Sequence, residues 1–261
     1  DVVRSRGLGD VYKRQVKPGY LFAALKGVKD DGVRFVPDAI KNGATAILVE
    51  QGVDIADGDV PTIQRYNARA TLARIAAKFF AGQPEQLVAV TGTNGKSSVV
   101  DLFRQLAELA GHKAASIGTL GVHHEGQTET FGLTTPDPVK FHETLAELGR
   151  KGVTYAAFEA SSHGLEQYRV DGVRLKAAAF TNLSRDHLDY HSSLEDYLFA
   201  KLRLFGEILS PHAIAVINMD DDFAHEVETL AWVRGITTMS VGERGAVSYT
   251  HLRAHETEQH R

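Results

Sequence analysis

Short apolar runs alternate with amphipathic stretches in the first part of the chain. Apolar runs bounded by turn residues are typical of buried strands, and apolar positions three or four residues apart are typical of helices. The predicted elements are strands at 21–25 and 45–50 and helices at 35–43 and 68–81. Gly82 and Pro84 end the last of these helices. We therefore expect a small α/β domain over residues 16–84.

The same alternation continues over residues 85–247, where the strands are almost entirely apolar. Strands are predicted at 87–92, 153–161, 175–183 and 213–220, and helices at 97–111, 138–150 and 194–209. Strands without polar positions are typical of a parallel sheet with helices on both faces. The predicted fold class is α/β: a small N-terminal α/β domain, then a larger domain with a mostly parallel sheet.

Composition narrows the class of protein further. The chain has 261 residues, of which 43% are hydrophobic and 24% charged, as in a globular protein. A net charge of −4 argues against nucleic acid as a partner. There is no cysteine, which excludes disulfides and thiolate metal sites. No apolar run approaches the roughly 18 residues of a membrane span, so we expect a cytoplasmic protein with no membrane partner.

Both ends of the chain lack these patterns. Residues 1–15 and 248–261 resemble translated adapter sequence, and frayed polar termini are the alternative interpretation. We expect both stretches to be non-native ends and the chain to be a truncated gene fragment.

The most informative segment is VAVTGTNGKSS, residues 88–98. An apolar strand runs into a glycine-containing loop, and a helix begins directly after it. Such a loop can hold phosphate oxygens on its backbone amides, with Lys96 near the outer phosphates and Ser97 near Mg²⁺. The spacing departs from the usual P-loop pattern, because Val90 stands where the first glycine would be. A chance Gly-Lys-Ser is the alternative, and the position between strand and helix favours phosphate binding.

The variant TGTNGKS resembles the ATP-binding loop of the Mur ligase family. Residues 16–50 resemble the UDP-binding domain of those Mur ligases that add the third residue of the peptidoglycan stem peptide. Five further segments resemble central-domain motifs of the family, in the family's order: LTTPDP (133–138), FEASSHGLEQYRV (158–170), FTNLSRDHLDYH (180–191), DYLFAKLRLF (196–205) and VINMDD (216–221). The resemblance covers residues 16–247 and implies an incomplete N-terminal domain, an incomplete ATP-binding central domain and no C-terminal domain.

The resemblance implies an ATP-dependent amide ligase that acts through an acyl phosphate. Its substrates would be UDP-MurNAc-L-Ala-D-Glu and an amino acid, either meso-diaminopimelate or L-lysine, and we expect a monomer. A folylpolyglutamate synthetase-like ligase and a nucleotide-binding P-loop module remain the alternatives.

By the same resemblance, ATP would contact Gly92, Thr93, Asn94, Gly95, Lys96, Ser97, Ser98, Asn218 and Asp220. Mg²⁺ would be held by Ser97, Glu159, His187 and a carbamylated Lys201, and Lys96, His187 and Lys201 would be the catalytic residues. From the residues alone, Glu159 could instead be a solvent-facing strand end and Lys201 a solvated helix residue. Asp221 and Asp222 could equally be helix caps.

The substrate contacts that the resemblance implies are Thr134, Thr135, Ser161, Gln167, Arg169 and Asn182. An arginine suits a carboxylate or phosphate, and neutral groups supply hydrogen bonds. Thr134 to Asp137 could also be an ordinary turn.

Two departures from the family's pattern affect the expected activity. Lys13-Arg14-Gln15 stands where the family has Asp-Ser-Arg, and the chain ends before the domain that selects the amino acid. We therefore expect the chain as given to be inactive, which turnover in a phosphate-release assay would contradict.

Overall fold

The computed structural model of the chain describes residues 16–27, 31–55, 60–130, 132–184 and 191–245. The chain divides into two compact units. The first unit comprises residues 1–83, 136–150 and 167–172, and the second comprises residues 84–135, 151–166 and 173–261. The two stretches expected to be non-native ends lie outside the described residues.

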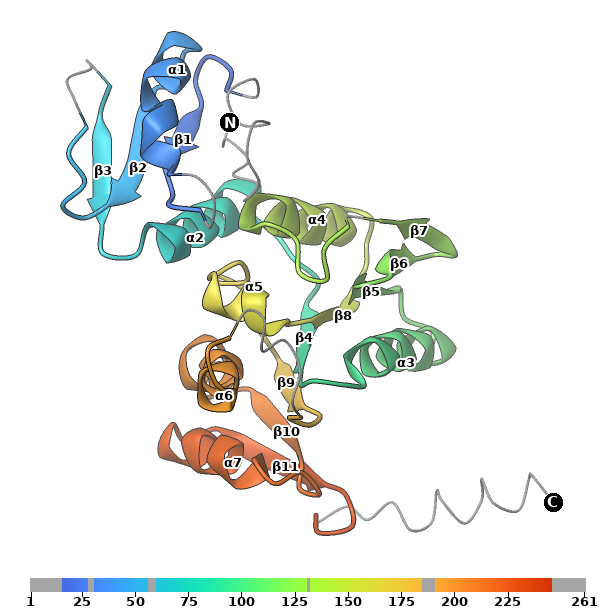
Figure 1. The fold of residues 1–261 in the computed structure, drawn as a ribbon. Coiled ribbons are helices and arrows are strands. Elements are labelled where there is room, and N and C mark those ends of the chain that lie inside the picture. Colours follow the sequence, from blue (N-terminus) through green and yellow to red (C-terminus); the bar gives the residue numbers. More distant parts are fainter. Residues whose placement is uncertain (1–15, 28–30, 56–59, 131, 185–190, 246–261) are drawn as a thin grey trace. The chain divides into compact units, whose positions relative to one another are not determined.

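Three parallel strands form the sheet of the first unit: β1 (Leu21–Ala23), β2 (Ala46–Glu50) and β3 (Thr62–Arg65), in that order. The chain between β1 and β2 forms a short 3-10 helix, Gly32–Phe35, and α1 (Val36–Lys41). After β3 comes α2 (Ala68–Phe80) (Figure 1). The central strand is buried on both faces, because Ile47 and Val49 pack with the residues of α1 whereas Leu48 packs with those of α2.

A helix from later in the sequence completes this unit. α4 (Pro138–Arg150) packs along α2, and its Val139 is fully buried in one cluster with Leu72 and Ala76 of α2. Asp137 caps α4 by accepting hydrogen bonds from the amides of Val139 and Lys140, at 3.1 and 3.0 Å. The sequence pattern predicted this helix and placed it with residues 85–247, whereas contacts group residues 136–150 with the first unit.

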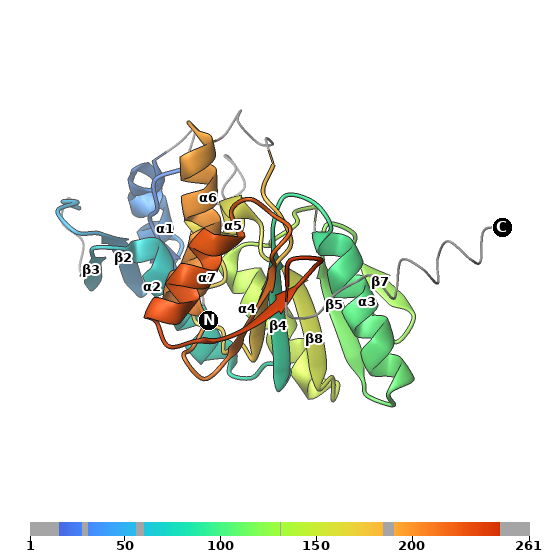
Figure 2. The ribbon, with the colours of Figure 1, turned by 90° about the horizontal axis from the view of Figure 1, so that it is seen from below.

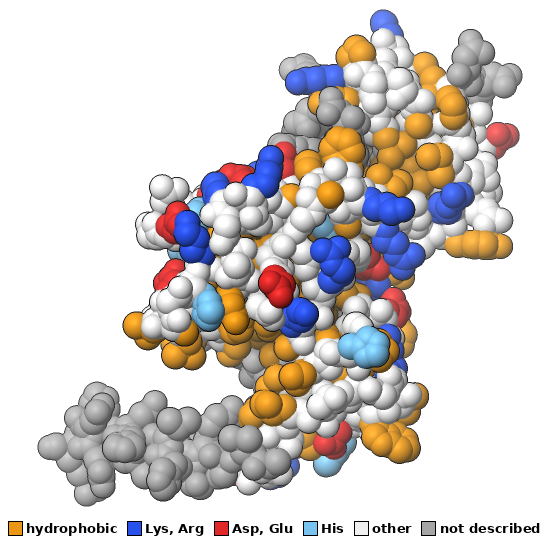
Figure 3. Space-filling view, turned by 180° about the vertical axis from the view of Figure 1, so that it is seen from behind, with side chains coloured by type: hydrophobic (Ala, Val, Ile, Leu, Met, Phe, Trp, Pro, Cys, Tyr) orange, Lys and Arg blue, Asp and Glu red, His pale blue; other side chains and the backbone are white. Residues whose placement is uncertain are grey.

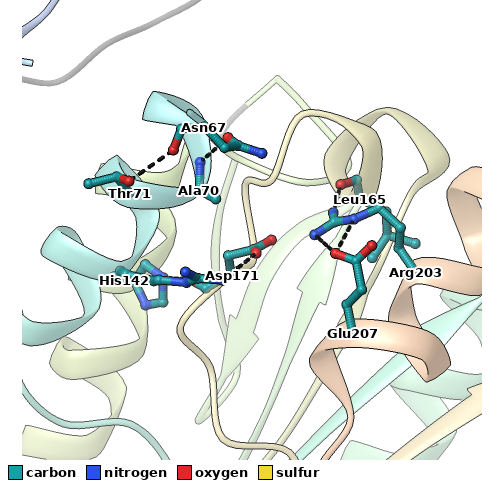
Figure 4. A network of polar contacts seen from close by, with 9 residues as sticks. Asn67, Ala70, Thr71, His142, Leu165, Asp171, Arg203 and Glu207 are labelled. Atoms are coloured by element: carbon teal, nitrogen blue, oxygen red, sulfur yellow. Dashed lines mark hydrogen bonds and ion pairs between the residues drawn. The ribbon is translucent and has the colours of Figure 1, made fainter. Parts of the chain in front are cut away.

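A buried histidine ties α4 to the segment 167–172. The His142 ring nitrogen Nε2 lies 2.9 Å from the Asp171 carbonyl oxygen (Figure 4), and 4% of the residue is exposed. Since a carbonyl only accepts hydrogen bonds, Nε2 carries a proton and donates it. Burial lowers the pKa of His142 to about 4, against a smaller opposing effect of the hydrogen bond to Asp171. The ring is therefore neutral at pH 7.

Eight strands form the sheet of the second unit, in the order β11-β10-β9-β4-β8-β5-β6-β7. Their bounds are β4 Gln86–Thr91, β5 Ala114–Gly118, β6 Gly121–His124, β7 Gln127–Glu129, β8 Tyr155–Glu159, β9 Ala177–Phe180, β10 Ile214–Asn218 and β11 Thr237–Val241. The strands from β11 to β5 are parallel, and the β6–β7 hairpin is antiparallel at one edge. The α/β prediction with a mostly parallel sheet is confirmed.

Helices cover both faces of this sheet. α3 (Lys96–Leu109) lies on one side, and α5 (Ser162–Glu166), α6 (Leu194–Arg203) and α7 (Ala224–Val233) lie on the other (Figures 1 and 2). A π-helical turn, Leu204–Ile208, extends α6. Val90 of β4, Ala157 of β8 and Val100 of α3 pack together at the centre, as an all-apolar strand pattern requires. Because β8, β4 and β9 are adjacent parallel strands, their carboxyl ends lie side by side.

Surface composition is mixed on the face that Figure 3 shows, where hydrophobic, basic and acidic side chains lie next to one another. In the part of the chain that the structure describes, no helix combines the length and the apolar character that crossing a bilayer requires.

Candidate functional site

The predicted phosphate loop joins β4 to α3. β4 ends at Thr91 and α3 begins at Lys96, so residues 92–95 form a tight connection. Gly92 and Gly95 have φ values of 144° and 83°, which favour glycine. A Cβ on Gly92 would overlap with the Thr181 hydroxyl, so only glycine lets the loop lie this close to the chain after β9.

The segment after β9 holds the loop in place. The Thr93 amide donates to the Asn182 carbonyl oxygen at 2.8 Å, and the Asn94 amide donates to Asn182 Oδ1 at 2.9 Å. Thr181 Oγ1 donates to the Asn94 carbonyl oxygen at 2.7 Å. The amides that begin α3 lack intrahelical acceptors, as at every helix start, and carry the positive end of the helix dipole. Such amides are the ones suited to phosphate oxygens.

Two lysines meet at one backbone carbonyl of this loop. Lys96 Nζ donates to the carbonyl oxygens of Gly92 and Thr93 at 3.0 and 2.7 Å. Lys201 Nζ, which comes from α6 and is buried, donates to the same Gly92 oxygen at 2.8 Å. Lys201 is thus not the solvated helix residue that its sequence alone allowed. The two amines concentrate positive charge beside the helix start, where a polyphosphate would be attracted.

Tyr197 supports both Lys201 and the loop. Lys201 Nζ lies 4.2 Å from the centre of the Tyr197 ring, and Tyr197 Oη lies 3.3 Å from Thr93 Oγ1. Tyr197 lies in the segment DYLFAKLRLF but was not predicted as a site residue. It precedes Lys201 by four residues on α6, so helical spacing alone places both side chains on one face.

The hydroxyl of Ser97 meets a buried carboxylate. Ser97 Oγ donates to Glu159 Oε1 at 2.9 Å, and Glu159 at the end of β8 is 2% exposed. Glu159 is therefore not a solvent-facing strand end. The Thr119 amide and hydroxyl also donate to this carboxylate, at 2.8 and 3.2 Å. Thr119 was missed by sequence analysis, although the end of a parallel strand is where such residues gather.

The predicted substrate residues fall into two groups. Thr134, Thr135, Ser161 and Asn182 belong to the second unit, and Gln167 and Arg169 belong to the first. Thr135 Oγ1 lies 2.9 Å from Ser161 Oγ and donates to the Glu159 carbonyl oxygen at 2.9 Å. In the first unit, the Arg169 guanidinium donates to Gln167 Oε1 at 3.2 and 2.7 Å.

The two predicted adenine contacts make hydrogen bonds within the protein. Asn218 donates to the Thr181 carbonyl oxygen at 2.8 Å, and the Asp220 carboxylate accepts from the amides of Glu243 and Arg244 at 3.1 Å each. Asp221 accepts from the Leu183 amide at 2.9 Å and from the Phe223 amide, which directly precedes α7, at 3.0 Å. The Asn218 bond links the end of β10 to the Thr181 segment that holds the phosphate loop.

His187, the remaining predicted metal ligand, lies outside the described residues. Among the residues that are described, no three His, Asp or Glu side chains gather in a way that could hold a metal ion by themselves. Further ligands of a divalent cation at Ser97 and Glu159 would come from phosphate oxygens, from water or from residues outside the described part of the chain.

A glycine loop joins a buried parallel strand to a helix, Lys and Ser stand at the helix start, and a carboxylate lies on the adjacent strand of the sheet. This is the arrangement of nucleotide-phosphate-binding α/β proteins. Comparison with known proteins assigns the chain within that class. Residues 90–261 match the Mur ligase middle domain, and residues 14–80 match the Mur ligase family catalytic domain. The chain belongs to the Mur ligase family.

A relative from Brucella melitensis, UDP-N-acetylmuramoyl-L-alanyl-D-glutamate--2,6-diaminopimelate ligase, is 51% identical over 89% of this chain and 48% of its own length. A solved structure with the same enzyme name has 31% identity and a TM-score of 0.78, covering 91% of this chain and 47% of its own. The Escherichia coli FolC structure, in complex with DHPP and ADP, shares the fold alone: identity is 15% and the TM-score 0.50, over 67% of this chain and 46% of its own. The chain spans about half the length of the curated relatives it matches.

Proposed function

We propose that this chain carries the nucleotide-binding and UDP-sugar-peptide-binding parts of an ATP-dependent ligase. The reaction joins 2,6-diaminopimelate to the D-glutamate carboxylate of UDP-MurNAc-L-Ala-D-Glu, in peptidoglycan synthesis. The observation that carries the proposal is 51% identity, over 89% of this chain, to a relative with that enzyme name. The relative's name also favours diaminopimelate over L-lysine, the choice that the sequence motifs left open.

ATP fits the loop between β4 and α3. Its phosphates would bind the amides at the start of α3 and the Lys96 ammonium, which now turns back onto the Gly92 and Thr93 carbonyls. Asn94 and Asn182 brace the loop, and the Asn218 and Asp220 segments at the end of β10 would face the adenine.

Mg²⁺ fits the pair formed by Ser97 and Glu159, because a buried carboxylate beside a hydroxyl is a typical donor set for a hard cation. When bound, the ion neutralises phosphate charge as the phosphoryl group transfers. We propose His187 as a further ligand by family resemblance. We also propose carbamylation of Lys201, whose amine is buried beside that of Lys96; carbon-13 NMR after labelling with carbon dioxide tests it.

The side chains of this chain act mainly by position and charge. Lys96 offsets the negative charge that gathers when the substrate carboxylate attacks the terminal phosphoryl group, and a carbamylated Lys201 would help hold Mg²⁺. That attack breaks the bond between the terminal and the second phosphate, releases ADP and forms an acyl phosphate. The amine of the amino acid then displaces phosphate from it and forms the amide. Thr134, Thr135 and Ser161 lie around Glu159 and would place the dipeptide carboxylate next to the phosphoryl group.

We propose that Gln167 and Arg169 bind the remainder of the muramoyl dipeptide. Arg169 presents a planar guanidinium, which suits a carboxylate or phosphate oxygen, and Gln167 holds it in orientation. Nucleotide-linked substrates are consistent with a cytoplasmic location, which we also propose. We propose further that the protein is a monomer.

A hybrid enzyme tests the proposed function. Residues 16–245 of this chain replace the matching segment of the Brucella melitensis relative, which supplies the remaining half. We expect phosphate release only when ATP, UDP-MurNAc-L-Ala-D-Glu and diaminopimelate are all present. The same hybrid with Lys96→Ala is the control and should release none above background. Release without UDP-MurNAc-L-Ala-D-Glu, or with a pteroate substrate in its place, would contradict the proposal.

A further inference from the structure

One residue outside the motifs holds both oxygens of the Glu159 carboxylate. The Thr119 amide donates to Oε1 at 2.8 Å, and the Thr119 hydroxyl donates to Oε2 at 3.2 Å. Oε1 also accepts from Ser97 Oγ. Because both oxygens are engaged, the carboxylate cannot rotate about its last bond without breaking a hydrogen bond to Thr119. Its orientation toward the phosphate loop is thus fixed before any ligand binds.

The residue before Thr119 provides the space for this contact. A Cβ on Gly118 would overlap with Oε1, the carboxyl carbon and Cγ of Glu159. The end of β5 therefore approaches the Glu159 side chain as closely as a backbone can. Such an approach lets the Thr119 amide and hydroxyl reach the same carboxylate.

The directions of these hydrogen bonds also determine whether the Thr134 hydroxyl donates or accepts. A hydroxyl has one proton, and an ionised carboxylate only accepts hydrogen bonds. Since Thr119 donates its proton to Glu159, the Thr134 hydroxyl, 3.0 Å from Thr119 Oγ1, must be the donor in that pair. The Thr134 hydroxyl can then only accept a hydrogen bond from any further group. The carboxylate orientation and the polarity of Thr134 depend on the same Thr119 hydroxyl.

We propose that Thr119 is a positioning residue that fixes the Glu159 carboxylate for a divalent cation and sets the Thr134 hydroxyl as an acceptor toward the substrate. This rests on the proposed function, in which Glu159 holds Mg²⁺ beside the nucleotide. The contacts of Thr119 are with Glu159 and Thr134. It acts through Glu159, so its loss affects binding that depends on the metal and leaves the phosphate loop unchanged.

Calorimetric titration of the full chain with ATP, with and without Mg²⁺, tests the assignment. Thr119→Val keeps the shape and removes the hydroxyl, and Thr119→Ala removes it with less bulk. We expect both variants to bind ATP about tenfold more weakly in the presence of Mg²⁺, equivalent to about 1.4 kcal/mol. ATP binding without the metal should be unchanged, and Thr119→Ser should restore the affinity to within about twofold.

Thr128→Val is the matched control, because Thr128 is an exposed threonine on β7 of the same unit, with its hydroxyl 2.9 Å from His123. It should bind ATP like the unaltered chain. Equal Mg²⁺-dependent binding by the unaltered chain and Thr119→Val would overturn the assignment alone, and so would a Thr119→Ser variant as weak as Thr119→Val. No Mg²⁺-dependent binding by the unaltered chain would overturn the proposed function and this assignment with it.

Discussion

Buried polar side chains have different roles in the two units. In the first unit they are spread along α4, where Asp137 caps the helix and His142 binds one backbone carbonyl. In the second unit they gather at the carboxyl ends of the central strands, where Glu159 accepts three hydrogen bonds and two lysines share one carbonyl.

The contrast shows that burial of a polar group does not by itself mark a functional site. Asp137 and His142 each have backbone partners that account for their burial, and their effect is on stability. At the carboxyl ends of the central strands in the second unit, charges of both signs lie close together around a helix start. Convergence of several groups, rather than burial, distinguishes the candidate site.

A pair of glycine substitutions gives the largest expected effect. Gly92→Ala should lower the free energy of unfolding by about 4 kcal/mol, because the new Cβ overlaps with Thr181 at a positive φ. Gly52→Ala in the first unit, where φ is 81° and nothing lies within 4 Å of the new Cβ, should cost about 1 kcal/mol. Urea unfolding measures both, and equal losses would contradict the close approach at the phosphate loop.

The next effect is a dependence of stability on pH in the first unit. His142 has a pKa of about 4 when folded and about 6.5 when unfolded, so the unfolded chain takes up the proton first. Stability from the neutral ring is present above pH 6.5 and is lost as the pH falls toward 4, by about 3 kcal/mol in total.

His142→Gln keeps a donor for the Asp171 carbonyl and should flatten this loss in urea unfolding between pH 7 and pH 4. His225→Gln replaces a histidine whose side chain is 81% exposed and serves as the control. A His142→Gln curve parallel to that of the unaltered chain would contradict the prediction.

The smallest expected effect is on ligand binding in the second unit. Lys96→Ala should weaken ATP binding by the chain about 100-fold, because an ammonium that binds phosphate contributes about 2.7 kcal/mol. Lys113→Ala removes an exposed lysine of the same unit, which pairs with Glu125, and should bind ATP normally. Calorimetry measures both. Unchanged binding by Lys96→Ala would argue against the phosphate loop.

Sequence pattern predicted most of the buried strands but missed β5, which is buried throughout, and it predicted the edge strands poorly. The apolar strands β2, β4, β8, β9 and β10 were all expected, because burial on both faces leaves an unbroken apolar run. β3, β7 and β11 were not, since Thr62–Arg65, Gln127–Glu129 and Thr237–Val241 are mostly exposed and carry little apolar pattern. A periodic helix such as α4 also does not reveal which part of the molecule its apolar face will pack against.

The residues of the candidate site also fall into those that the sequence could identify and those that it could not. Gly92, Lys96 and Ser97 stand together in the sequence, so one motif could identify them. That motif and the family resemblance also led to Glu159 and Lys201, which the structure places against Ser97 and Gly92. Thr119 lies outside every motif, and Tyr197 lies in DYLFAKLRLF but was not predicted as a site residue. The contacts of both depend on how separate strands and helices meet. Their detection requires the three-dimensional structure.

The position of α4 along the chain also determines when the first unit can form during synthesis. Its strands and α2 are complete by residue 83, yet the helix that covers α2 ends at Arg150, and the segment that receives the His142 hydrogen bond runs to residue 172. Until then Leu72 and Ala76 lack their partner Val139. A ribosome must therefore translate most of the second unit's central strands before the first unit can close, and a chain cut after residue 83 would carry an uncovered apolar face.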